Sequence, residues 1–94
     1  MNFNKLYKII KDRQDKLPSG SYTTSLFQEG PDRIIQKVGE EAVETIIAAK
    51  NPNKSLVISE IADLLFHLLV MMAYLKIRPK NVFEELETRN NSKK

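Results

Sequence analysis

The feature that most constrains this chain is a long apolar run that contains acidic residues. Residues 56–75 read LVISEIADLLFHLLVMMAYL, in which nearly every side chain belongs in a core except Glu60, Asp63 and His67. The uninterrupted part, 64–75, is too short to span a bilayer as a helix, and the longer run carries the acids. We therefore expect a buried helix here and no membrane association.

Hydrophobic spacing and helix-breaking residues predict further helices along the chain, and strand signals are absent. Ser21 and Ser55 are placed to cap helices, Gly30 to end one, and Pro31 to begin the next. The expected helices cover about residues 2–16, 21–27, 31–50, 55–77 and 79–89, with a frayed tail at 90–94.

The expected fold class is all-α, a helical bundle of four to five helices in a single domain, residues 1–94. Short connections between long helices favour antiparallel neighbours. Val82, Phe83 and Leu86 of the last helix are expected to face inward. The central helix is apolar on most sides and needs more partners than a small monomer offers, so we expect a homodimer to complete a four-helix-bundle core.

Composition narrows the functional classes. The chain has 94 residues, a formal net charge of +3 and no cysteine. This charge suits anionic small molecules but is too small and too scattered to indicate nucleic-acid binding. A disulfide framework is excluded, and the N-terminal segment lacks the features of a signal peptide. We expect a cytoplasmic protein.

Two pairs of acidic residues share one spacing on consecutive helices. Glu41 and Glu44, and likewise Glu60 and Asp63, are three residues apart, which places each pair on one face of its helix. Two facing helices can then present these carboxylates to one point. Oxygen-only ligation selects Mg²⁺, Mn²⁺ or Ca²⁺ over zinc. Rigid carboxylates on helices suit Mg²⁺, for which Mn²⁺ can substitute, and Mg²⁺ commonly shares its shell with phosphates. The pattern therefore indicates a Mg²⁺ site that serves phosphate chemistry.

Other interpretations of the acids stay open. On the first helix the acidic arc, taken alone, is typical of a solvated face. On the second, Glu60 and Asp63 lie among apolar residues, where an unpaired carboxylate is costly. They could form ion pairs with Lys37 or Arg33, or line a polar cavity without a metal. A di-iron site is disfavoured because the chain has no Glu-x-x-His motif.

Two further residues lie close to the acids in the helical pattern. His67, four residues after Asp63, is expected to be a core histidine that hydrogen-bonds a carboxylate. Lys37 precedes Glu41 by four residues and leans over the acids. It could bind a polyphosphate beside the metal or balance the carboxylate charge.

The same residues resemble a known family. Glu40-Glu41-x-x-Glu44, followed by Glu60-x-x-Asp63, resembles the EExxE…ExxD signature of the all-α MazG-like nucleoside-triphosphate pyrophosphohydrolases. The surrounding segments are similar to those of the phosphoribosyl-ATP pyrophosphatases of histidine biosynthesis: SYT at 21–23, LF at 26–27, KVGEEA at 37–42 and EIADLLFHLLV at 60–70. The similarity covers about residues 3–89.

The resemblance implies Mg²⁺-dependent hydrolysis of phosphoribosyl-ATP between its α and β phosphates, a step of histidine biosynthesis. The Mg²⁺ ligands of the family fall on Glu41, Glu44, Glu60 and Asp63, with Glu40 close by as a ligand or base. Relatives form dimers or larger assemblies, and many are fused to the cyclohydrolase of the next step, for which this chain has no room.

For the reaction we expect Glu40 or Glu44 to accept a proton from water and Lys37 to steady the departing pyrophosphate. The segment 21–27 is expected to contribute to recognition of the phosphoribosyl group or to the fold of the pocket. The number of metal ions stays open. So do two rival functions: a housecleaning enzyme of the same superfamily that hydrolyses non-standard nucleoside triphosphates, and a helical interaction module with structural acids.

Overall fold

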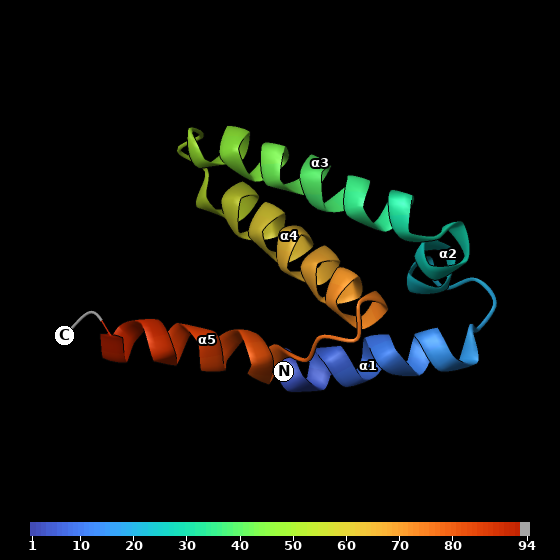
Figure 1. Ribbon diagram of the computed structural model, residues 1–94. Helices are drawn as coiled ribbons and strands as arrows, with labels where there is room; N and C mark the ends of the chain where they lie inside the picture. The colour runs from blue at the N-terminus through green and yellow to red at the C-terminus, as the bar shows by residue number, and fades with distance from the viewer. Residues whose placement is uncertain (93–94) are drawn as a thin grey trace.

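The computed structural model describes residues 1–92, which form five helices and no strand (Figure 1). The expected all-α fold class is therefore confirmed. In chain order the helices are α1 (Phe3–Lys16), α2 (Tyr22–Glu29), α3 (Pro31–Ala49), α4 (Lys54–Tyr74) and α5 (Pro79–Ser92). The long helices α3 and α4 run side by side in opposite directions, α1 lies across the C-terminal end of α4, and α2 connects α1 to α3 (Figure 1).

Side chains that accept backbone hydrogen bonds define where helices begin. Ser21 Oγ accepts a hydrogen bond from the backbone N–H of Thr24 at 3.3 Å and caps α2, as expected. Helix α4 differs, because its cap is Asn53, whose Oδ1 accepts from the N–H of Ser55 at 3.0 Å. The assignment of Ser55 as the cap was wrong by two residues, since Asn is as good an N-cap as Ser and comes first.

A glycine turn sets the angle between α2 and α3. Gly30 ends α2 and has a backbone φ of 95°. Residues that carry a Cβ rarely adopt this angle, whereas glycine does so readily. Pro31 follows as the first residue of α3, where its missing N–H costs nothing. This Gly-Pro pair lets α3 begin one residue after α2 ends, and Ile34 in the first turns of α3 is part of the core.

The core lies where α1, α2 and the start of α3 meet the C-terminal half of α4. Its buried apolar residues are Ile10, Leu26, Ile34, Leu69, Val70 and Ala73. Further along the α3–α4 pair, apolar side chains remain uncovered: Ile46 is 63% exposed, Ile47 66% and Ile58 67%. A single chain therefore buries only one end of its two longest helices.

Helix α5 is longer than expected and only partly covered. It continues to Ser92 instead of ending near Arg89, so residues 90–92 are helical, while 93 and 94 of the expected frayed tail lie outside the described residues. Its apolar residues Val82, Phe83 and Leu86 face inward, toward a cavity that they line together with residues of α4, but they are incompletely covered and stay 43–50% exposed. The helix begins beside α1 and its far end extends beyond α1 (Figure 1), and its packing includes a ring contact between Phe83 and Phe3.

Helix α4 is the one helix in residues 1–92 that is long and apolar enough to cross a membrane, a criterion that core helices also meet. Its buried residues, His67, Leu69, Val70 and Ala73, all lie in its C-terminal half. The expected buried helix is thus confirmed for that half. In the N-terminal half many apolar side chains are exposed in a single chain.

Candidate metal centre

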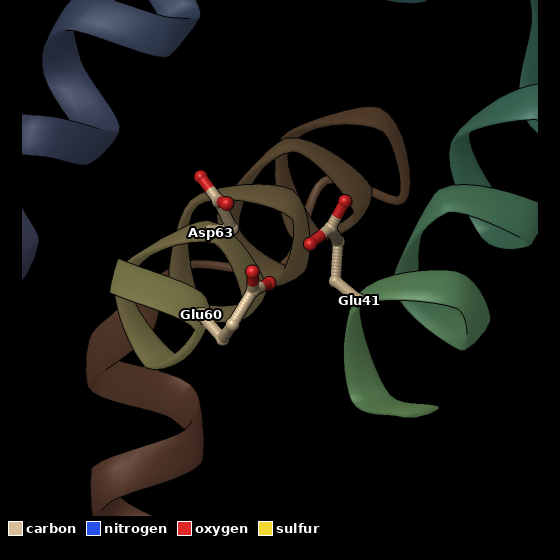
Figure 2. A group of neighbouring side chains, drawn as sticks. All are labelled: Glu41, Glu60 and Asp63. Atoms are coloured by element: carbon tan, nitrogen blue, oxygen red, sulfur yellow. The ribbon is translucent and has the colours of Figure 1, made fainter. Parts of the chain in front are cut away.

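The acids of α3 and α4 meet where the two helices pack together (Figure 2). Glu41 comes from α3, Glu60 and Asp63 come from α4, and one carboxylate oxygen of each lies within 4.8 Å of the others. The shared helical face that the spacing predicted for Glu60 and Asp63 brings them together. Three of the four acids expected at one point are therefore neighbours.

These carboxylates differ in burial. Glu41 is only 6% exposed, Glu60 is half-buried and Asp63 is exposed. The Oε2 atoms of Glu41 and Glu60 are buried and have no hydrogen-bond partner in residues 1–92. Leaving a buried acceptor unpaired costs about 1–3 kcal/mol. A bound cation would stabilise the protein here, because it would pair with these two buried carboxylate oxygens.

Glu44, the fourth expected acid, lies beside this cluster. It is exposed and lines a shallow hollow together with Glu60. The negative charge of Glu41, followed by that of Glu60, raises the pKa of Glu44 above its ordinary value. The negative charge at the site is therefore high enough to favour the protonated form of the neighbouring Glu44 carboxyl group.

Lys37 supplies positive charge directly at the acids. Its Nζ lies 3.3 Å from Glu40 Oε2 and 3.3 Å from Glu41 Oε1, and its side chain is 17% exposed. Desolvation lowers the pKa of Lys37, but hydrogen bonds to Glu40 and Glu41 outweigh it and raise the pKa above its ordinary value. Lys37 thus balances carboxylate charge, which is one of the two roles expected for it.

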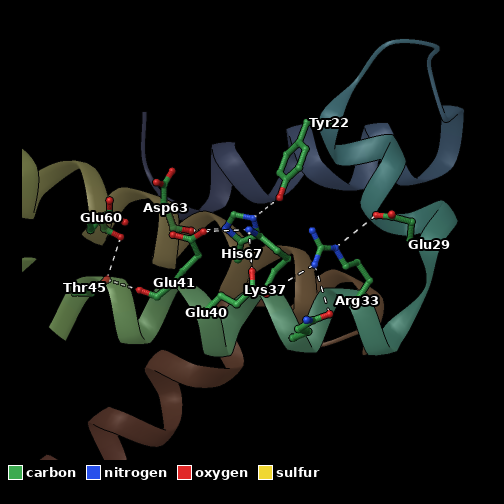
Figure 3. Close-up of polar contacts among 11 residues, drawn as sticks. Tyr22, Glu29, Arg33, Lys37, Glu40, Glu41, Thr45, Glu60, Asp63 and His67 are labelled. Carbon is green, nitrogen blue, oxygen red and sulfur yellow. Dashed lines mark hydrogen bonds and ion pairs between the residues drawn. The ribbon is translucent and has the colours of Figure 1, made fainter. Parts of the chain in front are cut away.

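Glu40 forms ion pairs with two basic side chains and is not part of the cluster formed by Glu41, Glu60 and Asp63. Besides Lys37 it pairs with Arg33, whose Nη1 is 3.9 Å away (Figure 3). Within residues 1–92 the ion pairs of Lys37 and Arg33 are with Glu29, Glu40 and Glu41, all on α2 or α3. The interpretation of the α4 acids as ion-pair partners of these two cations is therefore wrong.

His67 is a core histidine, as expected, but its hydrogen bonds differ from the expected ones. It is 5% exposed, and its Nδ1 donates to the backbone carbonyl of Asp63 at 2.7 Å instead of to a carboxylate. Its Nε2 therefore accepts from the Tyr22 hydroxyl at 2.9 Å (Figure 3). Both ring nitrogens are in use, so the imidazole links α2 to α4 and is not available as a ligand.

The donor set fits a hard divalent cation. The clustered atoms are all carboxylate oxygens, which suit Mg²⁺, Mn²⁺ or Ca²⁺ better than zinc. Lys37 offsets part of the negative charge, and its two contacts are on the α3 side of the cluster. The two unpaired oxygens of Glu41 and Glu60 are suited to ligate an ion.

Residues outside the expected set also take part in this region. Thr45 Oγ1 contacts the carbonyl oxygens of Glu41 and Glu60, and Tyr22 holds His67. Tyr22 falls in the segment 21–27 that was expected to contribute to the pocket. Thr45 was missed, although its position one turn after Glu41 is visible in the sequence.

Fold and site together define an all-α protein with a partly buried carboxylate cluster between its two longest helices. The chain belongs to the phosphoribosyl-ATP pyrophosphohydrolase family, whose sequence model, described as "Phosphoribosyl-ATP pyrophosphohydrolase", matches residues 3–90. It is therefore an enzyme, a hydrolase, and the family resemblance noted from the motifs is confirmed over nearly the whole chain.

Named relatives agree with this assignment. The chain is 48% identical over 88 residues to a protein from Pelotomaculum thermopropionicum, covering 94% of this chain and 90% of the relative. It is 50% identical over 86 residues to proteins from Saccharolobus islandicus and Saccharolobus solfataricus, covering 92% of each chain in both cases. All three relatives are called phosphoribosyl-ATP pyrophosphatase.

Proposed function

We propose that this chain hydrolyses phosphoribosyl-ATP between its α and β phosphates, releasing phosphoribosyl-AMP and pyrophosphate in a Mg²⁺-dependent reaction. The reaction is the second step of histidine biosynthesis, and we place it in the cytoplasm. The observation that carries the proposal is the meeting of Glu41, Glu60 and Asp63 within 4.8 Å in a chain of this family. A polyphosphate substrate needs a cation where the acids of the protein alone would repel it.

Glu41, Glu60 and Asp63, with Glu44 beside them, would hold the Mg²⁺. When bound, the ion supplies positive charge that stabilises the negative charge of the reacting phosphates. The two unpaired buried oxygens of Glu41 and Glu60 support this ligand set. Glu44 completes it from the exposed side, where it borders the same hollow as Glu60.

Proton transfer falls to Glu40 or Glu44, the two acids outside the cluster of three. Glu40 is engaged by Lys37 and Arg33, whereas the pKa of Glu44 is raised by Glu41 and Glu60. Both stay candidates for the base that takes the proton of the attacking water: Glu40 if Glu44 ligates the ion, and Glu44 if it does not. Lys37, at the edge of the acids, would then hold the departing pyrophosphate.

We also propose that the enzyme is a homodimer. The α3–α4 pair exposes apolar residues along its length, among them Ile35, Val43, Ile46, Ile47, Ile58 and Ile61. Exposed apolar area of this extent on one helix pair is unfavourable in water and marks an interaction surface. Two such pairs packed together would form the four-helix bundle expected from the sequence.

The test is pyrophosphate release from phosphoribosyl-ATP, measured with Mg²⁺ and then with excess EDTA. ATP and a panel of modified nucleoside triphosphates are assayed in parallel. Mg²⁺-dependent turnover confined to phosphoribosyl-ATP is the expected result.

Each other outcome has a defined meaning. Turnover of modified triphosphates in place of phosphoribosyl-ATP would replace the proposed substrate with those of a housecleaning enzyme. Turnover that persists in EDTA would refute the metal requirement. Release of pyrophosphate from none of the substrates would contradict the proposed reaction as a whole.

A further inference from the structure

The hydroxyl group of Thr45, on α3, contacts the backbones of both α3 and α4 at two residues of the carboxylate cluster. The hydroxyl oxygen of Thr45 is 2.7 Å from the carbonyl oxygen of Glu41 on its own helix. The same hydroxyl is 3.2 Å from the carbonyl oxygen of Glu60 on the facing helix (Figure 3). Because a hydroxyl carries one proton and both partners are acceptors, Thr45 shares this proton between them in a three-centre hydrogen bond. The two carbonyls belong to acids whose side chains meet in the cluster.

The contact with Glu60 is the informative one. A threonine inside a helix commonly donates to the carbonyl four residues earlier, and the bond from Thr45 to Glu41 needs no other explanation. Thr88 makes the same kind of bond to Glu84 in α5, at 3.0 Å. The contact of Thr45 with Glu60 crosses between helices, and helix geometry alone does not produce it.

The cross-helix contact acts against a repulsion built into the site. Glu41 and Glu44 on α3 face Glu60 and Asp63 on α4, so like charges push the two helices apart until a cation is bound. Thr45 is half-buried between the helices and ties the backbone of Glu60 to α3. The distance between the carboxylates of the two helices depends on this backbone separation.

We propose that Thr45 is a positioning residue for the cation site, because its hydroxyl fixes the backbone of Glu60 relative to that of Glu41. The inference rests on the proposed Mg²⁺-dependent function. Groups that orient metal ligands without touching the metal typically contribute 10–100-fold to metal affinity or activity. Loss of the Thr45 hydroxyl should therefore weaken Mg²⁺ binding far more than it alters the fold.

The experiment compares Thr45→Val, which keeps the branched shape and removes the hydroxyl, with Thr45→Ser, which keeps the hydroxyl. Thr88→Val is the matched control, since it removes a hydroxyl that also bonds the carbonyl four residues earlier but lies on α5. Two readouts are taken for each: the rise in thermal unfolding midpoint with Mg²⁺ concentration, and the Mg²⁺ concentration for half-maximal turnover. Thr45→Val should raise both Mg²⁺ midpoints about tenfold or more, while Thr45→Ser and Thr88→Val stay near wild type.

Two results would overturn the inference. If Thr45→Val keeps the Mg²⁺ midpoints of the wild type, even with a lower stability in EDTA, Thr45 is only a packing contact. If the wild-type chain responds to Mg²⁺ in neither readout, the proposed function fails and this inference fails with it. Thr45→Ala, a smaller side chain, provides the same comparison should the valine variant not fold.

Discussion

Glu41, Glu60 and Asp63 bring three carboxylates within 4.8 Å of one another, and Lys37 offsets part of their charge from the α3 side. Such an arrangement is unfavourable for folding alone, because like charges repel and buried oxygens go unpaired. Residues that lower stability in this way commonly serve function. Substitutions at these positions should therefore separate activity from stability.

Replacement of Glu60 or Asp63 by alanine should abolish pyrophosphate release and leave a folded protein. Each substitution removes a ligand oxygen and, at the same time, relieves part of the repulsion between α3 and α4. Turnover and the far-ultraviolet circular dichroism spectrum are measured together. Asp32→Ala is the control, since Asp32 is an exposed acid in the first turn of α3. Full activity in Asp63→Ala would refute the metal assignment.

Lys37→Met separates the two roles of this lysine. Loss of its charge should strengthen Mg²⁺ binding to the acids, because a competing cation is removed, and should raise KM for phosphoribosyl-ATP if the ammonium also holds phosphate. Without Mg²⁺ the variant should be less stable by about 1–3 kcal/mol, since buried Glu41 loses its partner. Urea denaturation in EDTA and steady-state kinetics measure the two effects; an unchanged KM would leave Lys37 with charge balance alone.

His67→Ala should reduce turnover about tenfold, a milder loss than that of Asp63→Ala. The imidazole joins the hydroxyl of Tyr22 to the backbone of Asp63, so its removal loosens α2 against α4 without removing a carboxylate. Tyr22→Phe, which breaks the same link from the other side, should show a similar loss. Activity of His67→Ala as low as that of Asp63→Ala would show that the imidazole acts on the substrate itself.

At the level of helices, the sequence located most ends correctly because the deciding residues act locally. Ser21 caps a helix through its hydroxyl, Gly30 ends one because it lacks a Cβ, and Pro31 fits the first position of the next, and these preferences are local. The start of α4 was misplaced, since Ser55 was predicted as the cap and Asn53 caps the helix in the structure. Both residues can cap a helix, and the choice depends on which one comes first after Pro52.

Asn53→Ala should destabilise the protein by about 1 kcal/mol, because α4 loses the oxygen that accepts the N–H of Ser55. Ser55→Ala, two residues later, should change the free energy of unfolding by no more than a few tenths of a kcal/mol. Urea denaturation of the two variants gives both values. Equal destabilisation by the two substitutions would contradict the assignment of Asn53 as the cap.

The faces of α3 show where sequence periodicity stops being informative. Helical spacing identified the acidic arc of this helix, but an acidic arc taken alone is typical of a solvated face and does not show that it packs against α4. In the structure the acidic side, with Glu41 and Thr45, lies against α4, whereas Ile35 and Ile46 on the apolar arc are 53% and 63% exposed. Periodicity shows that a helix face is apolar, but it does not show what covers that face. The packing partner can be a second chain.

At the scale of the whole molecule, the uncovered α3–α4 pair predicts the oligomeric state. The wild-type protein should sediment at twice its chain mass of 10.8 kDa. Ile58→Glu, at a position 67% exposed in the single chain, should shift it toward the monomer, because a charge would be buried at the interface. Lys8→Glu, an exposed change on α1, is the control for charge alone. A wild-type monomer at micromolar concentration would refute the dimer.

The position of the acids within α4 has a consequence for how the cell handles the newly made chain. The helix spans Lys54–Tyr74 and is apolar enough to resemble a transmembrane segment, and Asp63 lies next to its midpoint. An aspartate at the centre of a helix raises the free energy of translocon-mediated insertion by about 2.5–3.5 kcal/mol, which offsets several leucines. The carboxylates proposed to hold the metal therefore also make insertion of this helix into a lipid bilayer less favourable.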